Sequence, residues 1–264
     1  MIVALLLGRK GSSGFPGKNI FPVMGRPLAY YPMKAALSSS KVGKVYLSTD
    51  DEKLMELAVQ NDVEVIVRPP DLCTNEALGE DAYVHGYYEI KKRNKMSEIK
   101  LIVLLFCNAP TITSGLINNG LDILIEHPEY DSAVSASCYN MWSPLRARKI
   151  GEEGLLVPFV PFETFGDPKT LNCDRDSQGD TWFADMGVSI VRPRCLEKIE
   201  DGLLPQKWMG QKIYPLKQWG GLDVDYEWQI PQVEYWLRKH GFNDTKTMEI
   251  TENTQESKLG DWMV

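Results

Sequence analysis

The chain has 264 residues, of which 43% are hydrophobic and 25% are charged, and its net charge is −7. This length and composition are typical of a globular protein with one large α/β domain or two small ones. No apolar run approaches the ~18 residues that a transmembrane helix needs, and residues 1–7 lack the flanks of a signal peptide. We therefore expect a cytoplasmic protein with no membrane partner.

Apolar runs alternate with amphipathic segments through the first half of the chain. This rhythm is typical of a Rossmann-like α/β fold, in which a mostly parallel sheet carries helices on both faces. The expected strands are residues 2–7, 44–48, 63–67, 101–106, 132–137 and 187–191. The expected helices are residues 27–39, 52–61, 78–92, 113–126 and 226–240. Ligands of such sheets bind at the carboxyl ends of the strands, so the loops after Leu7, Leu47, Val67 and Phe106 are the places to expect a site.

The rhythm breaks between about residues 139 and 182, a stretch rich in proline, glycine and aromatic residues. Forty residues without a helix inside a compact domain usually form a functional excursion or an arm. Short strands are expected there at residues 148–150 and 155–159. We expect one domain over residues 1–250, with this arm inserted in it, and a polar tail at 251–264.

The charge is unevenly distributed along the chain. Seven basic residues precede the first acidic residue, Asp50: Arg9, Lys10, Lys18, Arg26, Lys34, Lys41 and Lys44. A segment without acidic residues in an acidic chain indicates a local site for an anion. A small polyphosphate fits this pattern better than a nucleic acid, which usually needs a broad basic face.

The segment GRKGSSGFPGKN, residues 8–19, follows the first expected strand and is the best candidate for that anion site. Gly8, Gly11 and Ser12 would expose backbone N–H groups and let the chain approach phosphate oxygens closely. Arg9 can form two parallel hydrogen bonds to a phosphate, and Lys18 supplies a point charge. The spacing matches neither the Walker loop nor the dinucleotide fingerprint.

Cysteine and histidine chemistry is disfavoured. The five cysteines are scattered without a C-x-x-C pair, and they are expected to be small buried side chains. The three histidines are far apart in the sequence, which disfavours a histidine metal site and a Ser-His-Asp hydrolase.

Several motifs resemble, in the same order, those of the CMP-sialic acid synthetases, a family of cytidylyltransferases related to the CMP-Kdo synthetases. The opening segment resembles the family's R-x-x-S-K-x-x-x-x-K-N signature. The further matches are STD at 48–50, EVIVRPPDL at 64–72, PLR at 144–146 and DVD at 223–225. The resemblance covers roughly residues 1–240, and the first motif together with RPPDL is its most specific part.

The resemblance implies a nucleotide-binding α/β sheet and a homodimer formed through the 139–182 arm. It implies transfer of CMP from CTP to the anomeric hydroxyl of a 2-keto-3-deoxy sugar acid, with release of pyrophosphate. Arg9 and Lys18 match the residues that hold the triphosphate, and Asn19 and Arg68 match positions near the nucleotide. Asp223 and Asp225 match the carboxylates that bind Mg²⁺; two residues apart on an extended segment, they can share a hard cation.

The differences from the family lie on the acceptor side. Phe106 stands where the sialic acid enzymes have a glutamine that contacts the sugar, and Ile112 stands where they have an arginine. Asn108 stands where the Kdo enzymes have an acidic metal ligand. Arg146 and Arg175 on the arm are the candidates for binding the sugar's carboxylate; Arg148 and Arg194 are alternatives.

Three interpretations therefore remain open. The first is a CMP-sugar acid synthetase, with a sialic-like acid, another acidic sugar or a sugar phosphate as acceptor, and with CTP or GTP as the nucleotide. The second is a glycosyltransferase in which DVD is a metal-binding D-x-D motif, although that motif normally follows a strand in the middle of the chain. The third is a nucleotide-binding protein that has lost catalysis, against which the retention of both aspartates argues.

Overall fold

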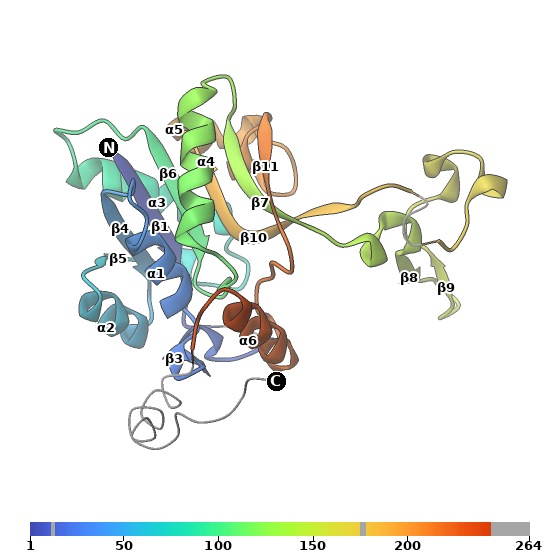
Figure 1. Ribbon diagram of the computed structural model, residues 1–264, viewed down its shortest axis with the longest axis horizontal. Coiled ribbons are helices and arrows are strands. Elements are labelled where there is room, and N and C mark those ends of the chain that lie inside the picture. Colours follow the sequence, from blue (N-terminus) through green and yellow to red (C-terminus); the bar gives the residue numbers. More distant parts are fainter. Residues whose placement is uncertain (12–13, 175–177, 244–264) are drawn as a thin grey trace, which may run out of the picture.

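The computed structural model describes residues 1–11, 14–174 and 178–243. Its centre is a seven-stranded sheet in the order β11-β7-β10-β6-β1-β4-β5, which confirms the predicted mostly parallel α/β class (Figure 1). The strands are β1 (Ile2–Leu7), β4 (Lys44–Thr49), β5 (Glu64–Val67), β6 (Leu101–Phe106), β7 (Ser132–Cys138), β10 (Trp182–Val191) and β11 (Ile213–Gln218). Only β10 runs antiparallel to its neighbours in this sheet.

Helices cover both faces of the sheet, and the alternation of side chains along β1 shows why. Ala4 and Leu6 lie in one core with residues of α1 (Tyr30–Leu37), α2 (Glu52–Gln60) and α4 (Ser114–Glu126). Val3, Leu5 and Leu7 lie in a second core with α3 (Gly79–Arg93) and α5 (Pro193–Glu197). Successive side chains of a strand point to opposite faces, so an uninterrupted apolar strand is one that is buried on both sides.

A third core joins the last helix to the opening segment. Helix α6 (Ile230–Lys239) contributes Trp236 and Leu237, which pack with Val23 and Tyr31 near the amino terminus. Val224 belongs to the same core. This packing brings the residues on either side of Val224 to the segment that follows β1.

Three expected boundaries were wrong. The strand expected at 187–191 begins at Trp182, because β10 pairs with β7 from Trp182 onward. The helix expected at 27–39 begins only at Tyr30, because Pro27 belongs to the short hairpin of β2 (Pro22–Val23) and β3 (Arg26–Pro27). Met24 and Gly25 both have positive φ, 48° and 79°, the geometry of a two-residue hairpin turn. The helix expected from residue 226 begins at Ile230, after a 3₁₀ turn at Glu227–Gln229.

The described residues 139–174 and 178–181 extend away from the sheet as an arm (Figure 1). It contains the hairpin of β8 (Arg148–Ile150) and β9 (Leu156–Pro158), where short strands were expected, and several 3₁₀ turns. The tail expected at 251–264 lies outside the described residues. Among the described residues, no helix is both long and apolar enough to span a membrane.

Candidate nucleotide and metal site

A cavity of about 210 Å³ lies at the carboxyl ends of the parallel strands, where the strand order predicted a site. Five of the residues expected to bind a nucleotide line it: Gly8, Arg9, Lys18, Asn19 and Arg68. Phe106 and Asn108, two of the expected substrate-binding residues, line it as well. Residues from β1, β6 and the loops after β1 and β5 therefore converge on one volume.

Close packing makes glycine necessary at two points around this cavity. A Cβ at Gly8 would lie 2.6 Å from Leu54 Cδ1 and 2.8 Å from Cys107 Sγ. A Cβ at Gly14 would lie 2.7 Å from the backbone oxygen of Asp225. The glycines thus let the loop after β1 pack against the core at one end and against the DVD segment at the other.

Hydrogen bonds join the opening loop to the other motifs. Arg9 donates from Nη1 to the carbonyl oxygens of Cys73, at 3.3 Å, and Thr74, just after RPPDL. The backbone N–H of Lys10 donates to Asp50 Oδ1 of the STD motif at 2.9 Å. The STD motif and the segment after RPPDL, although far from the opening loop in the sequence, are therefore both hydrogen-bonded to it.

Arg68 is a buried cation at the base of the cavity, with 6% of its surface exposed. Its Nε donates to Ser48 Oγ at 3.2 Å and its Nη2 to the Ser48 carbonyl at 2.7 Å. Burial lowers the pKa of its guanidinium, yet an arginine remains charged at neutral pH. Since none of the described carboxylates forms an ion pair with it, its charge is available to an anionic ligand.

The two aspartates of DVD lie beside the basic residues. Lys18 Nζ is 2.7 Å from Asp225 Oδ1, an ion pair between the opening loop and the DVD segment. Asn19 is buried and donates to the Arg9 carbonyl at 3.2 Å, which fixes the turn between Arg9 and Lys18. A loop with no acidic residue of its own thus has its acidic partner more than 200 residues later.

Asn108 links the end of β6 to the same segment. Its side-chain Nδ2 donates to the Val224 carbonyl at 3.0 Å, and its own carbonyl accepts from the Val224 N–H at 2.8 Å. The side-chain amide of Asn108 also favours the ionised form of Asp223. The pKa of Asp223 is nevertheless raised, first by burial and then by the nearby charge of Asp225.

The DVD pair fits a hard divalent cation. Burial and like charge both disfavour ionised Asp223, and a cation bound by both carboxylates would remove that cost. Asp223 and Asp225 would be its protein ligands, and both offer the oxygen donors that Mg²⁺ prefers. Among the described residues there is no cluster of three or more histidine, cysteine, aspartate or glutamate side chains that could hold a metal, so the remaining ligands would have to be substrate oxygens and water.

The structure does not bring every expected residue to this cavity. Gly11 is exposed and is not part of its lining, while Ser12 and Arg175 lie outside the described residues. Asp223 and Asp225 are not part of the lining either; Asp225 reaches it through its ion pair with Lys18. Arg146 lies on the arm, where its Nη2 donates to the Cys173 carbonyl at 2.6 Å.

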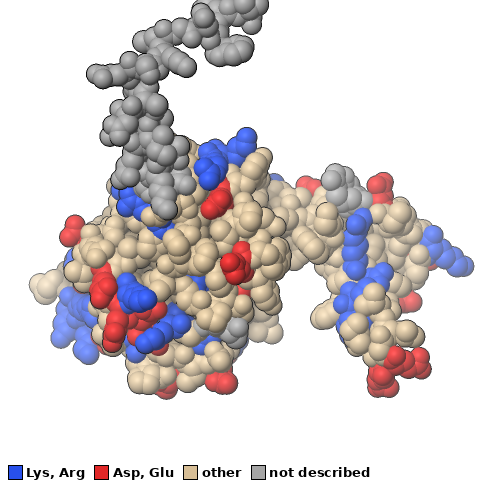
Figure 2. All heavy atoms as spheres, turned by 90° about the horizontal axis from the view of Figure 1, so that it is seen from below, with Lys and Arg blue, Asp and Glu red and all other residues tan. Residues whose placement is uncertain are grey.

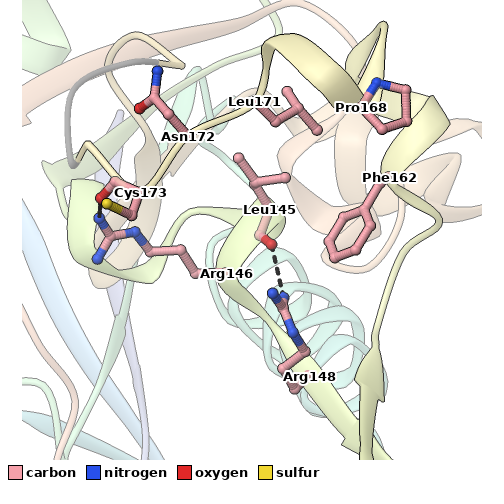
Figure 3. Close-up of a pocket in the computed structure, with 8 residues that line it drawn as sticks. All are labelled: Leu145, Arg146, Arg148, Phe162, Pro168, Leu171, Asn172 and Cys173. Atoms are coloured by element: carbon pink, nitrogen blue, oxygen red, sulfur yellow. Dashed lines mark hydrogen bonds between the residues drawn. The ribbon is translucent and has the colours of Figure 1, made fainter.

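Arg146 lines a larger cavity, of about 710 Å³, which is on the arm and not at the strand ends (Figure 3). Beside it, Arg148 donates to the Leu145 carbonyl at 2.8 Å and stacks on Phe162, 5.1 Å from the ring centroid. Both arginines already bond to main-chain oxygens. The smaller cavity is the better candidate for a polyphosphate, because unpaired Arg68 and several motifs converge there.

Sequence reasoning missed some of the site. Ala77, Leu78 and Gly79, at the start of α3, line the cavity, but nothing in their side chains indicates binding. The rings of Tyr83 and Trp208 lie 5.2 and 6.1 Å from that of Phe106 and support it from behind, although neither residue lines the cavity. Asp185 of β10 is buried behind the DVD segment, and only its charge inside an apolar strand pattern could have marked it.

The fold is a mostly parallel α/β sheet with helices on both faces and a cavity at the strand ends. Similar solved structures include the CMP:2-keto-3-deoxy-manno-octonic acid synthetase complexed with CTP, at a TM-score of 0.62 and 15% identity over 90% of this chain and 99% of that one. A cytidylyltransferase from Leptospira borgpetersenii has a TM-score of 0.53 and 17% identity over 100% of this chain and 98% of that one. At such identities the likeness shows the fold alone.

The chain belongs to the cytidylyltransferase family, whose model matches residues 3–141. The N-acylneuraminate cytidylyltransferase of Streptococcus agalactiae serotype V is 26% identical over 160 residues, 60% of this chain and 37% of the relative. N-acylneuraminate cytidylyltransferase A of Danio rerio is 28% identical over 245 residues, 91% of this chain and 52% of the relative. The 3-deoxy-manno-octulosonate cytidylyltransferase of Synechococcus elongatus is 24% identical over 183 residues, 69% of this chain and 62% of the relative. This chain therefore spans less than two thirds of the length of these relatives.

Proposed function

We propose that this protein transfers CMP from CTP to an acidic 2-keto-3-deoxy sugar, a sialic-acid-like nonulosonate, and releases pyrophosphate in a Mg²⁺-dependent reaction. The observation that carries the proposal is the convergence of Arg9, Lys18 and Arg68 on one cavity, together with the ion pair between Lys18 and Asp225, which brings the DVD segment to the same loop. The relatives support it, since their names specify N-acylneuraminate, 3-deoxy-manno-octulosonate and pseudaminic acid as substrates.

The residues of the site divide the work of a phosphoryl-type substitution. Arg9, Lys18 and Arg68 would neutralise phosphate oxygens, and the backbone of the opening loop would hold them in place. Asp223 and Asp225 would hold Mg²⁺, which supplies charge neutralisation at the phosphates. Lys18 must exchange Asp225 for a phosphate oxygen, so triphosphate and cation binding are expected to assist each other.

The acceptor would lie toward Phe106 and Asn108, beyond the triphosphate. Phe106 gives the cavity an apolar wall where a glutamine would offer hydrogen bonds, and the buried rings of Tyr83 and Trp208 pack against it. Such a wall favours an acceptor with an apolar face or an acyl group on that side. The acceptor's carboxylate needs a cation, and Arg146 is the candidate if the arm of a second chain reaches the site.

The arm would supply a homodimer contact. Six large apolar side chains on it are more than half exposed: Met141, Trp142, Ile150, Leu155, Leu156 and Phe159. In Figure 2 the arm stands apart from the body, and uncharged surface lies between its charged side chains. Exposed apolar groups at this density usually mark an interaction surface.

The function is tested by incubating the protein with Mg²⁺, each of the four nucleoside triphosphates and a panel of keto sugar acids and sugar phosphates, and measuring pyrophosphate. We expect release with CTP and a keto sugar acid only. Transfer from a ready-made nucleotide sugar would indicate a glycosyltransferase instead. No turnover, with CTP still raising the melting temperature, would indicate a non-catalytic nucleotide-binding protein.

A further inference from the structure

Asp185 is a carboxylate buried in the sheet, away from the cavity lining. Only 5% of it is exposed, and it forms no ion pair with any residue that the structure describes. Oδ1 accepts from Ser135 Oγ at 2.5 Å and from the Gly187 N–H at 3.1 Å. Oδ2 accepts from Ser137 Oγ at 2.6 Å and from Gln218 Nε2 at 2.9 Å. A buried charge without a countercharge is tolerable only when its oxygens are satisfied in this way.

The backbone around Asp185 departs from regular strand geometry. The pairing of β10 with β7 changes register between Ala184 and Ser189. Within that interval Met186 has a φ of 61°, in the left-handed region that residues other than glycine seldom occupy. Irregularities of this kind are over-represented near functional sites, where they redirect a side chain. Here the irregularity surrounds the carboxylate with its four donors.

The Asp185 cluster touches the segment that carries the DVD aspartates. Ser137 Oγ, which donates to Asp185, accepts the Gly221 N–H at 3.0 Å. A Cβ at Gly221 would lie 2.1 Å from Asp185 Oδ2, so the carboxylate packs directly on the main chain at Gly221. Gln218 donates both to Asp185 and, at 3.2 Å, to the Thr111 carbonyl.

Residues 221–225 have no regular secondary structure and are held at Gly221, Leu222 and Val224 by side chains of β7, β10 and the segment after β6. Ser137 and Asp185 hold Gly221, the Thr111 hydroxyl pairs with the N–H and carbonyl of Leu222 at 2.9 and 3.1 Å, and Asn108 holds Val224. Of these contacts, the one at Gly221 involves the buried carboxylate of Asp185. It is also the contact nearest the point where the chain leaves β11.

We propose that Asp185 is a positioning residue that sets the place of Asp223 and Asp225 through Ser137 and the Gly221 backbone. Asp185 does not touch the substrate or the cation. This inference rests on the proposed function, since it presumes that the two aspartates bind a divalent cation with the nucleotide. Residues that orient metal ligands from behind typically change metal affinity by about 10- to 100-fold when they are replaced.

The test is a Mn²⁺ titration in the presence of saturating CTP, followed by water-proton relaxation, which reports cation bound to the protein and needs no turnover. It compares the wild type with Asp185→Asn, which keeps the size of the side chain but replaces one acceptor oxygen with a donor. We expect Asp185→Asn to weaken Mn²⁺ binding at least about tenfold while remaining folded by circular dichroism.

Asp131→Asn is the matched control. Asp131 is another partly buried carboxylate that accepts backbone N–H groups, but it lies at the opposite end of β7 from Ser137. We expect Asp131→Asn to lower the melting temperature and to leave the Mn²⁺ affinity unchanged. If both variants lose Mn²⁺ affinity, the loss follows from lower stability, and the proposal is overturned.

Two further outcomes are decisive. If Asp185→Asn does not fold, Ser137→Ala is tested in its place, because it removes the hydrogen bond to Gly221 and keeps the Asp185 carboxylate. Wild-type Mn²⁺ affinity in whichever variant folds would overturn the inference. If the wild-type protein itself binds no Mn²⁺ with CTP, the proposed function fails, and the inference fails with it. Wild-type binding with unchanged affinity in the variants refutes the positioning role alone.

Discussion

Arg9 connects two motifs before any ligand arrives. Its guanidinium donates to carbonyls just after RPPDL, so it is held at the rim of the cavity instead of extending into solvent. A held arginine loses little conformational entropy when it meets a phosphate, and its planar fork suits two phosphate oxygens.

Arg9→Ala should therefore raise KM for CTP at least about tenfold, the equivalent of roughly 1.5 kcal/mol for a charge-assisted contact. Steady-state pyrophosphate release measures it. Arg26→Ala is the control, because Arg26 belongs to the same acid-free segment but stacks on Tyr30, outside the cavity lining. Equal KM values for the two variants would remove Arg9 from the triphosphate site.

Asp223 lowers the folding stability of the cation-free protein at neutral pH. Its pKa is raised by burial and by Asp225, so its ionised form opposes folding. Because the folded-state pKa of Asp223 is raised, its contribution to stability is complete below the unfolded-state pKa of about 3.9. That contribution is lost as the pH rises through the folded-state pKa. At neutral pH without metal, the charged carboxylate is destabilising.

Asp223→Asn should accordingly keep or raise the melting temperature at pH 7 without divalent cations, while kcat falls by about 100-fold or more because cation binding is lost. Thermal melts measure the change in melting temperature, and single-turnover assays measure the loss of rate. A variant that turns over normally would show that the carboxylate pair has been misassigned.

The strands and helices of the first half of the chain were predictable because their apolar periodicity and the capping and turn residues at their ends indicate the same elements. The strand at Ile213–Gln218 was not predicted, since Pro215 interrupts its pattern; it forms because β11 is an edge strand, where a missing N–H is tolerated. Of the candidate site, the sequence marks by charge residues such as Arg9 and Lys18, which the structure places together at one cavity. Asp185 and the start of α3 act through burial and backbone position, which depend on contacts between residues far apart in the sequence.

A second carboxylate holds the elements together at the far end of β7. Asp131 Oδ2 accepts the backbone N–H groups of Gln211 and Lys212, at 3.0 and 2.9 Å, just before β11. Its Oδ1 accepts from Arg194 Nε of α5 at 2.7 Å. Burial alone would raise the pKa of Asp131, but these donors together lower it.

The Asp131 contacts should therefore stabilise the fold above its unfolded-state pKa of about 3.9 and cease to do so as the pH falls through the lowered folded-state value. Urea unfolding of the wild type and Asp131→Asn across pH 3–7 measures this. We expect a constant advantage for the wild type near neutrality that shrinks below about pH 4. A difference independent of pH would mean that the contacts do not depend on the charge.

At the scale of the whole molecule, the arm is the feature that a single chain does not explain. The arm, which carries Arg146 and the exposed apolar side chains of the hairpin, extends away from the sheet (Figure 1), whereas Phe106 and Asn108 line the cavity at the strand ends. A second chain would both cover this surface and supply the cation missing from the acceptor end of the site.

Sedimentation velocity should therefore show a dimer, and Leu155→Ser with Phe159→Ser should shift it toward monomer and reduce turnover, because each site would lose the partner's arm. Met96→Ser is the control: Met96 is 99% exposed but lies on the body after α3. A wild-type monomer with full activity would refute the role of the arm.

A crystal structure of the protein with CTP and Mg²⁺ tests the central claim most directly, that the acid-free amino-terminal segment and the DVD aspartates form one triphosphate site. The account predicts triphosphate oxygens within hydrogen-bonding distance of Arg9 and Lys18, and a cation shared by Asp223 and Asp225. A nucleotide bound elsewhere, with Arg9 and Lys18 facing solvent, would contradict it.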